Sequence, residues 1–204
     1  MEDRRRRRTR AALRSAMGAL MVEKGYDALT VQDLIDRADI GRSTFYSHYT
    51  DKADLLGDML AELRTELERD PAGGPVDRRR PLRFSLSMFR HVRDERELLR
   101  AVLGRRDTQR VTHEIEAILT SLVAADLQVL ARASDPPRVP LDLVAQSVVA
   151  TFMAALTWWI TDGFRRTPEE MDALFQILAA PGVRASIPPR ASDRARPDGA
   201  ALLG

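Results

Sequence analysis

The sequence contains no cysteine, which excludes disulfide bonds, thiolate metal sites and cysteine nucleophiles. It also lacks the glycine-rich patterns that cradle phosphates and the G-x-S-x-G pattern of serine hydrolases. The 3 histidines are scattered along the chain, and "HEIEA" at 113–117 lacks the second histidine of H-E-x-x-H. These absences predict a protein that is not an enzyme and that has no metal site and no cofactor; a turnover screen tests the enzyme alternative.

Lysine is scarce, because Lys24 and Lys52 are the only lysines among 32 basic residues. The net charge is only +2, but the first ten residues, "MEDRRRRRTR", are strongly basic. Such a run is either a solvated flexible arm or a segment held against nucleic-acid phosphates. No apolar segment follows it, so no secretory signal is predicted, and a cysteine-free chain suits the cytoplasm.

Of the 204 residues, 44% are hydrophobic and 30% are charged, which is typical of a soluble globular protein. Apolar residues recur with helical period almost throughout, and no alternating strand pattern occurs. The sequence therefore predicts an all-α fold of about nine helices. We expect them near 9–24, 30–38, 42–48, 51–69, 82–93, 95–103, 106–131, 140–162 and 168–180.

The amino-acid composition divides the chain into an arm, two helical domains and a tail. Residues 1–8 are predicted to form a basic flexible arm, 9–56 a first helical domain and 57–184 a second helical domain. The segment "DPAGGPVDRRRP" at 70–81 is rich in proline and glycine and is interpreted as a linker. Residues 185–204 are proline-rich and aperiodic, so a disordered tail is expected.

The segment "LVAQSVVATFMAALTWWIT" at 143–161 carries no charge and is as long as a membrane span. It is interrupted by glutamine, serine and threonine, and a helix that is apolar all round can also lie between two packed layers. A buried helix is the leading interpretation. A membrane-tethered regulator that spans at 143–161 is the alternative, and detergent-free cell fractionation distinguishes the two.

The stretch 30–56, "TVQDLIDRADIGRSTFYSHYTDKADLL", has the pattern of a helix-turn-helix. An apolar-faced helix is capped by Thr30 and is followed by a short turn. The next helix can pack through Phe45 and Tyr49 while it exposes polar side chains. Arginine and threonine can contact base edges, and tyrosine and histidine can donate to phosphates. Lys52 follows at the start of another helix, where an anion is favoured.

This stretch resembles the DNA-binding signature of the TetR family of bacterial transcription regulators. The matching elements are T-x-x-x-L-x-x-x-A from Thr30, T-F-Y-x-H-Y from Thr44 and D-K-x-x-L-L from Asp51. A second, looser similarity lies in 158–178. The turn departs from the family in having Asp39 and Ile40 where glycine and valine are frequent, and Gly41 where a serine cap is common.

The resemblance implies a ligand-responsive repressor that binds a palindromic double-stranded operator as a homodimer, with an unknown small-molecule effector. It assigns residues 9–56 to the DNA-binding domain and 57–184 to a ligand-binding and dimerisation domain. The basic arm is assigned to the DNA backbone or an adjacent minor groove. The operator-contacting positions that the resemblance implies are Thr30, Arg42, Ser43, Thr44, Tyr46, His48 and Lys52.

The C-terminal half has more apolar surface than a small core needs. Because the helix at 140–162 is apolar on almost every face, we expect one side to face a second subunit, together with the helix at 168–180. The predicted dimer interface contains Ala150, Ala154, Thr157, Met171, Leu174, Phe175 and Leu178. Candidate effector-binding residues, for each of which core packing is the competing interpretation, are Phe84, Met88, His91, His113, Phe152, Met153 and Trp159.

Overall fold

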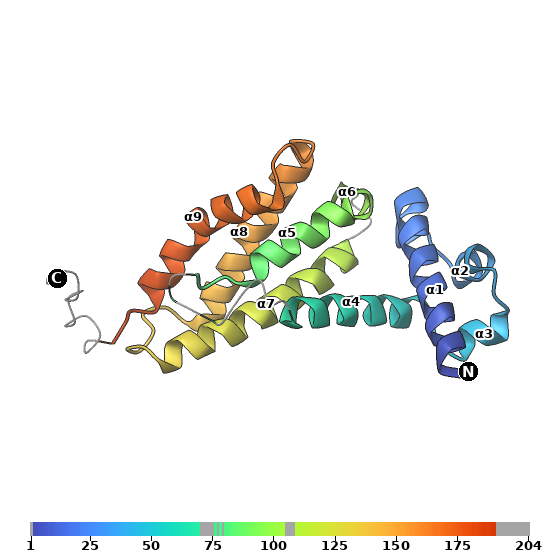
Figure 1. The fold of residues 1–204 in the computed structure, drawn as a ribbon, viewed down its shortest axis with the longest axis horizontal. Coiled ribbons are helices and arrows are strands. Elements are labelled where there is room, and N and C mark those ends of the chain that lie inside the picture. The colour runs from blue at the N-terminus through green and yellow to red at the C-terminus, as the bar shows by residue number, and fades with distance from the viewer. Residues whose placement is uncertain (1, 70–75, 77, 79, 105–108, 191–204) are drawn as a thin grey trace, which may run out of the picture. The chain divides into compact units, whose positions relative to one another are not determined.

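The computed structural model describes residues 2–69, 76, 78, 80–104 and 109–190. This part of the chain is helical and contains no β-strand, only an isolated bridge between Ser134 and Pro189. The all-α prediction is confirmed. The helices are labelled in Figure 1: α1 (Glu2–Lys24), α2 (Val31–Ala38), α3 (Arg42–Tyr46), α4 (Lys52–Arg69), α5 (Phe84–Asp94), α6 (Arg96–Gly104), α7 (Gln109–Arg132), α8 (Leu141–Thr161) and α9 (Pro168–Ser186).

Three helix ends differ from those expected. Helix α1 begins at Glu2, so the residues predicted to form a flexible arm continue its helical path. Helix α3 ends at Tyr46 and passes into a turn rather than continuing to residue 48. Helix α9 passes through Pro181 and ends at Ser186. Pro181 lies on the exposed face, where the carbonyl that loses its helical partner can be solvated.

The described chain packs as two units. The first comprises 2–69 and 91–117, and the second comprises the described residues of 70–90 and 118–190. The predicted boundary after residue 56 is therefore not where the packing divides, because α4 belongs to the first unit over its whole length. Most of the predicted linker and the tail beyond residue 190 lie outside the described residues.

Arg78 and Arg80, which fall in the predicted linker, are tied to the second unit. Arg78 donates a hydrogen bond of 2.8 Å to the carbonyl of Ile187. Arg80 pairs with Asp172 of α9 at 2.5 Å, and Asp172 also accepts a hydrogen bond from Ser85. The buried carboxylate of Asp172 is thus neutralised and hydrogen-bonded, as a buried charge requires.

The core of the second unit is a cluster of aromatic rings. Phe152 of α8 lies at its centre, with ring centroids 4.8 Å from Phe89, 5.3 Å from Phe84 and 5.3 Å from Phe175. Trp159, two helical turns further along α8, has its ring centroid 5.7 Å from that of Phe89. Offset and edge-to-face ring pairs of this kind add to the stabilisation from burial.

Helix α8 is long and apolar enough to cross a membrane by composition, with a mean hydropathy of 1.6. One face of it is nevertheless buried in the second unit, through Val144, Val148, Phe152, Leu156 and Trp159. A core helix of a soluble protein has the same composition. Nothing in the described residues supports the membrane-spanning alternative.

Candidate nucleic-acid interface

Helix α2 is fixed at its start by a reciprocal cap. The hydroxyl of Thr30 accepts a hydrogen bond from the Asp33 backbone N–H at 3.2 Å, and the Thr30 N–H donates to the Asp33 carboxylate at 2.7 Å. Lys24 pairs with the same carboxylate at 2.6 Å. These bonds, with the Lys24 contact foremost, hold the pKa of Asp33 below its ordinary value. The predicted cap is present, and the Thr30 side chain stays exposed next to it.

The turn between α2 and α3 uses a left-handed residue. Asp39 has φ 50° and ψ 54°, and its N–H donates to carbonyls of the last turn of α2. Aspartate tolerates this conformation better than most residues, which explains why glycine is dispensable there. Gly41 is the N-cap of α3 and supplies no side-chain hydrogen bond. The short helix therefore relies on packing for its position.

Helix α3 separates an inner face from an outer one. Phe45 is fully buried, and Tyr49 behind it is 3% exposed. Tyr46 is 49% exposed, and the Arg42 guanidinium lies 5.8 Å from its ring centroid. The predicted DNA-facing residues of this segment that are exposed or half-exposed are Arg42, Ser43, Thr44, Tyr46 and His48.

A partly buried hydrogen-bonded group supports α3 from behind. The Tyr49 hydroxyl donates to Asp58 of α4 at 2.6 Å, and Arg14 of α1 donates to the same carboxylate oxygen at 2.9 Å. Burial raises the pKa of Tyr49 to about 12, and the hydrogen bond to Asp58 adds to the shift. For Asp58, burial acts to raise the pKa, but the bonds from Tyr49 and Arg14 outweigh it, and the pKa is lowered.

This group predicts a pH-dependent contribution to stability. Because the folded-state pKa of Asp58 lies below its ordinary value of 3.8, its stabilisation is complete above that pH and is lost as the pH falls through the folded value. We expect Asp58→Asn to lower the urea midpoint at neutral pH and to differ less from wild type below about pH 4. The exposed Asp27→Asn is the control. A pH-independent difference contradicts the prediction.

The basic start of α1 lies beside the end of the α3 segment. Burial is the main cause that lowers the pKa of His48, and the positive charges of Arg6 and Arg10 lower it further. The imidazole is therefore neutral at pH 7 and keeps one N–H to donate. Arg6 and Arg10 are one helical turn apart, and both are exposed. Sequence reasoning treated the arm as a whole and missed these two positions, although their i, i+4 spacing was visible.

Lys52 differs from the others in the predicted set. Its ammonium donates to three backbone carbonyls of the loop before α2: Tyr26 at 2.9 Å, Asp27 at 3.1 Å and Leu29 at 2.8 Å. It also lies 4.7 Å from the Tyr26 ring centroid. These bonds use all three ammonium donors. In this geometry Lys52 fixes the loop to α4 and is not available to a phosphate.

We expect Lys52→Met to lower the free energy of unfolding by about 1–3 kcal/mol, because three carbonyls lose charge-assisted bonds. Denaturant unfolding of the DNA-free protein measures it. Lys24→Met, at the other lysine, removes one half-exposed ion pair with Asp33 and is expected to cost less than the loss of three carbonyl contacts. Unchanged stability together with weaker DNA binding would return Lys52 to the role that the sequence suggested.

The predicted dimer residues divide into two groups. Ala150, Ala154, Thr157, Leu174 and Leu178 are exposed. Met171 and Phe175 are buried in their own subunit, 1% and 0% exposed, so neither can face a partner. Met171 and Phe175 lie on the inner face of α9, at the helical spacing of Ala179. Apolar residues occur around most of this helix, so the sequence pattern did not separate its inner face from its outer face.

A stripe of mostly uncharged residues, called the uncharged stripe below, runs along α8 and α9, and Arg184 is the charged residue near its end on α9. Sequence reasoning missed its most exposed large hydrophobic residue, Ile177 at 70%, although it is three residues from Leu174. A groove of about 380 Å³ separates the two helices, with Leu143 on one side and Leu178 on the other. The exposed residues of the stripe are, on α8, Leu143, Ser147, Ala150, Ala154, Thr157, Trp158 and Thr161 and, on α9, Ala173, Leu174, Ile177, Leu178, Pro181, Gly182 and Ala185.

The predicted effector-binding residues do not line one pocket among the described residues. Phe84, Met88, Phe152 and Trp159 are buried in the second unit, each at most 4% exposed. Phe84, Phe152 and Trp159 belong to its aromatic core, so packing explains them. Met153 is half-exposed and His113 is exposed on α7. His91 lines a groove of the first unit instead.

A capped apolar helix, a short turn and an exposed polar helix form the helix-turn-helix of DNA-binding proteins. Residues 13–59 match the family model described as bacterial regulatory proteins of the tetR family, and 80–180 match the transcriptional regulator C-terminal region. The two matches together span most of the chain. The chain belongs to the TetR family of transcriptional regulators.

Solved structures agree in fold. A putative TetR-family regulator from Syntrophomonas wolfei is 18% identical with a TM-score of 0.70, and the match covers 86% of this chain and 94% of that one. NalD, the secondary repressor of the MexAB-OprM multidrug efflux pump in Pseudomonas aeruginosa, is 18% identical with a TM-score of 0.64, over 89% and 97% of the two chains.

Curated relatives match over a shorter stretch. The uncharacterized HTH-type regulator YxbF of Bacillus subtilis is 39% identical over 66 residues, which are 32% of this chain and 17% of YxbF. YdeS of the same organism is 34% identical over 58 residues, 28% of this chain and 29% of YdeS. The chain thus matches less than a third of the length of either relative.

Proposed function

We propose that this TetR-family protein is a cytoplasmic, ligand-responsive repressor that binds a palindromic operator as a homodimer. The observation that carries the DNA-binding part is the outer face of α3, where Arg42, Tyr46 and their neighbours are exposed while Phe45 anchors the helix. Thr30 at the start of α2 and Arg6 and Arg10 of α1 extend that surface. Lys52 contributes by holding the loop before α2.

The uncharged stripe of α8 and α9 supports the homodimer. An exposed apolar surface of this length on a soluble protein is typical of an interface. A two-fold dimer pairs the same stripe from both subunits and presents two α3 helices, which suits a palindromic site. Repression follows where the bound dimer blocks transcription. Among the similar structures, NalD is named a repressor and DhaS an operon activator, so transcription from the bound promoter distinguishes the two.

Tyr46→Ala tests the DNA-facing role of α3. We expect it to weaken binding to the operator by about tenfold per half-site and about a hundredfold for the dimer, since its ring and hydroxyl reach the DNA in both halves. The probe is a palindrome from the region upstream of the protein's own gene, followed by fluorescence anisotropy at fixed salt. We expect the variant to remain a dimer, and sedimentation velocity checks this.

The matched control is Val129→Ala, because Val129 of α7 is also 49% exposed but lies in the second unit. It is expected to leave operator affinity unchanged. If Tyr46→Ala binds like wild type, or if it dissociates the dimer, α3 is not the DNA-reading helix. No salt-sensitive complex of the wild-type protein with any palindrome in that region counts against the whole proposal.

A further inference from the structure

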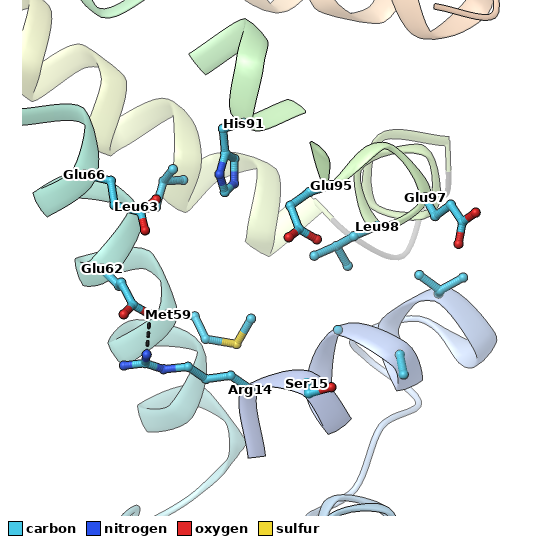
Figure 2. A pocket seen from close by; sticks show the side chains of 13 residues that line it. Arg14, Ser15, Met59, Glu62, Leu63, Glu66, His91, Glu95, Glu97 and Leu98 are labelled. Atoms are coloured by element: carbon cyan, nitrogen blue, oxygen red, sulfur yellow. Dashed lines mark ion pairs between the residues drawn. The ribbon is translucent and has the colours of Figure 1, made fainter. Parts of the chain in front are cut away.

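A groove of about 610 Å³ lies within the first unit, between α1, α4 and α6 (Figure 2). In that view Met59 of α4 and Leu98 of α6 point into the space from different sides. Volumes of this size hold drug-sized molecules. The apolar part of its lining is formed by Gly18, Ala19, Val22, Met59, Leu63 and Leu98.

The rim of the groove is acidic. Glu62 and Glu66 come from α4, Glu95 lies in the turn before α6, and Glu97 lies in the first turn of α6 (Figure 2). His91 of α5 also lines the groove. Arg14 is the one guanidinium in the lining, and it is already paired with Asp58 at 2.9 Å and with Glu62. For Glu66, Glu95 and Glu97 no ion pair occurs with any residue that the structure describes.

This combination favours one class of small molecule. An apolar body can cover the groove wall, and an ammonium attached to it can lie near the carboxylates of the rim. The apolar wall also limits the access of water, which strengthens the attraction between opposite charges. Anions are repelled by the same carboxylates. Met59 adds adaptability, since its unbranched side chain adjusts to different shapes.

We propose that the groove of α1, α4 and α6 binds small organic cations that carry an apolar body, with Glu66 and Glu95 as the principal counter-charges. The site is separate from the outer face of α3 and from the aromatic core of the second unit. Its occupancy requires neither DNA nor a partner subunit.

The test uses the full-length protein without DNA and two fluorescent probes that share one ring system. 1-Pyrenemethylamine is a cation, and 1-pyrenemethanol is its neutral counterpart. We expect the amine to bind about tenfold more tightly in fluorescence titrations, from ion pairs with more than one carboxylate. This advantage is expected to shrink when the ionic strength rises from about 0.05 M to about 0.5 M.

Variants locate the site. Glu66→Gln combined with Glu95→Gln is expected to remove the preference for the amine while the alcohol binds as before. Glu68→Gln is the control, because Glu68 lies on the same helix α4, pairs with Arg64 and does not line the groove. Ala19→Leu fills the groove and is expected to weaken both probes. Circular dichroism checks that each variant is folded.

Equal binding of amine and alcohol to the wild-type protein overturns the proposal, and so does an undiminished preference in the double variant. Binding that is insensitive to Ala19→Leu places the probe elsewhere and overturns it too. Operator binding is measured separately, so a failure here leaves the DNA-binding proposal untouched.

Discussion

Phe152→Ala is expected to lower the free energy of unfolding of the second unit by about 3–5 kcal/mol. Phe152 is fully buried, and its ring contacts those of Phe84, Phe89 and Phe175. The truncation leaves a cavity whose aromatic walls come from two other helices, α5 and α9, so collapse around it is limited. Urea unfolding followed by tryptophan fluorescence reports the change directly, because Trp159 lies in the same core.

Met153→Ala is the matched control, since Met153 is the next residue of α8 but is half-exposed. We expect Met153→Ala to lower the free energy of unfolding much less than Phe152→Ala does. A loss below about 1 kcal/mol for Phe152→Ala means that the cluster is loosely packed. In that event the predicted effector pocket among these aromatics regains support, because a core that tolerates the loss of a ring has room for a ligand.

Ile177→Asp together with Leu178→Asp is expected to convert the protein to monomers. The two side chains are 70% and 66% exposed on the uncharged stripe of α9. In a two-fold interface the changes place four carboxylates near one another without partners, which is strongly unfavourable. Operator affinity is expected to fall by about a hundredfold or more, because each half-site is then bound without the benefit of the other.

Sedimentation velocity gives the oligomeric state, and anisotropy gives the operator affinity. The double control Gln128→Asp with Val129→Asp introduces the same charges at two exposed positions of α7, away from the stripe. This control is expected to change neither the oligomeric state nor the operator affinity. A dimer that survives the α9 substitutions shows that the interface lies elsewhere, and the α8–α9 stripe then needs another occupant.

Local chemistry made much of the fold predictable. The cap expected at Thr30 is a capping box with Asp33, and Thr167 forms another with Glu170. Each needs only residues three positions apart. Gly25 ends α1 with φ 80°, and Asp39 takes the left-handed position of the turn. These features depend on a few neighbouring residues, so the sequence alone contains the information.

Features that depend on distant residues were not predictable. The proline rule ends α9 before Pro181, but Ala179, Ala180 and Val183 remain buried on the inner face and carry the helix onward. Lys52 has the composition of a phosphate contact, yet its partners are carbonyls that lie more than twenty residues earlier. No local pattern records such a pairing.

The candidate site shows the same division. The exposed face of α3 follows from its own spacing, with Phe45 inward and Tyr46 outward. The effector residues were chosen for size and polarity, and the structure uses the aromatic ones as core. The groove with the acidic rim combines α1, α4 and α6. Glu62 and Glu66 have helical spacing on α4, but their proximity to Glu95 and Glu97 depends on packing between distant segments, so periodicity could not reveal the groove.

The helical start of α1 limits how its arginines can work together. Successive side chains of a helix are rotated by about 100°, so Arg4 to Arg8 point around the whole circumference. In the proposed DNA-binding mode a duplex beside the helix meets Arg6 and Arg10, while others of the run face away. The number of arginines in the run is therefore larger than the number of counterions that binding of this helix would release from DNA. In return, the side chains that do meet the duplex are held at fixed intervals, and less chain freedom is lost than when a loose tail is immobilised.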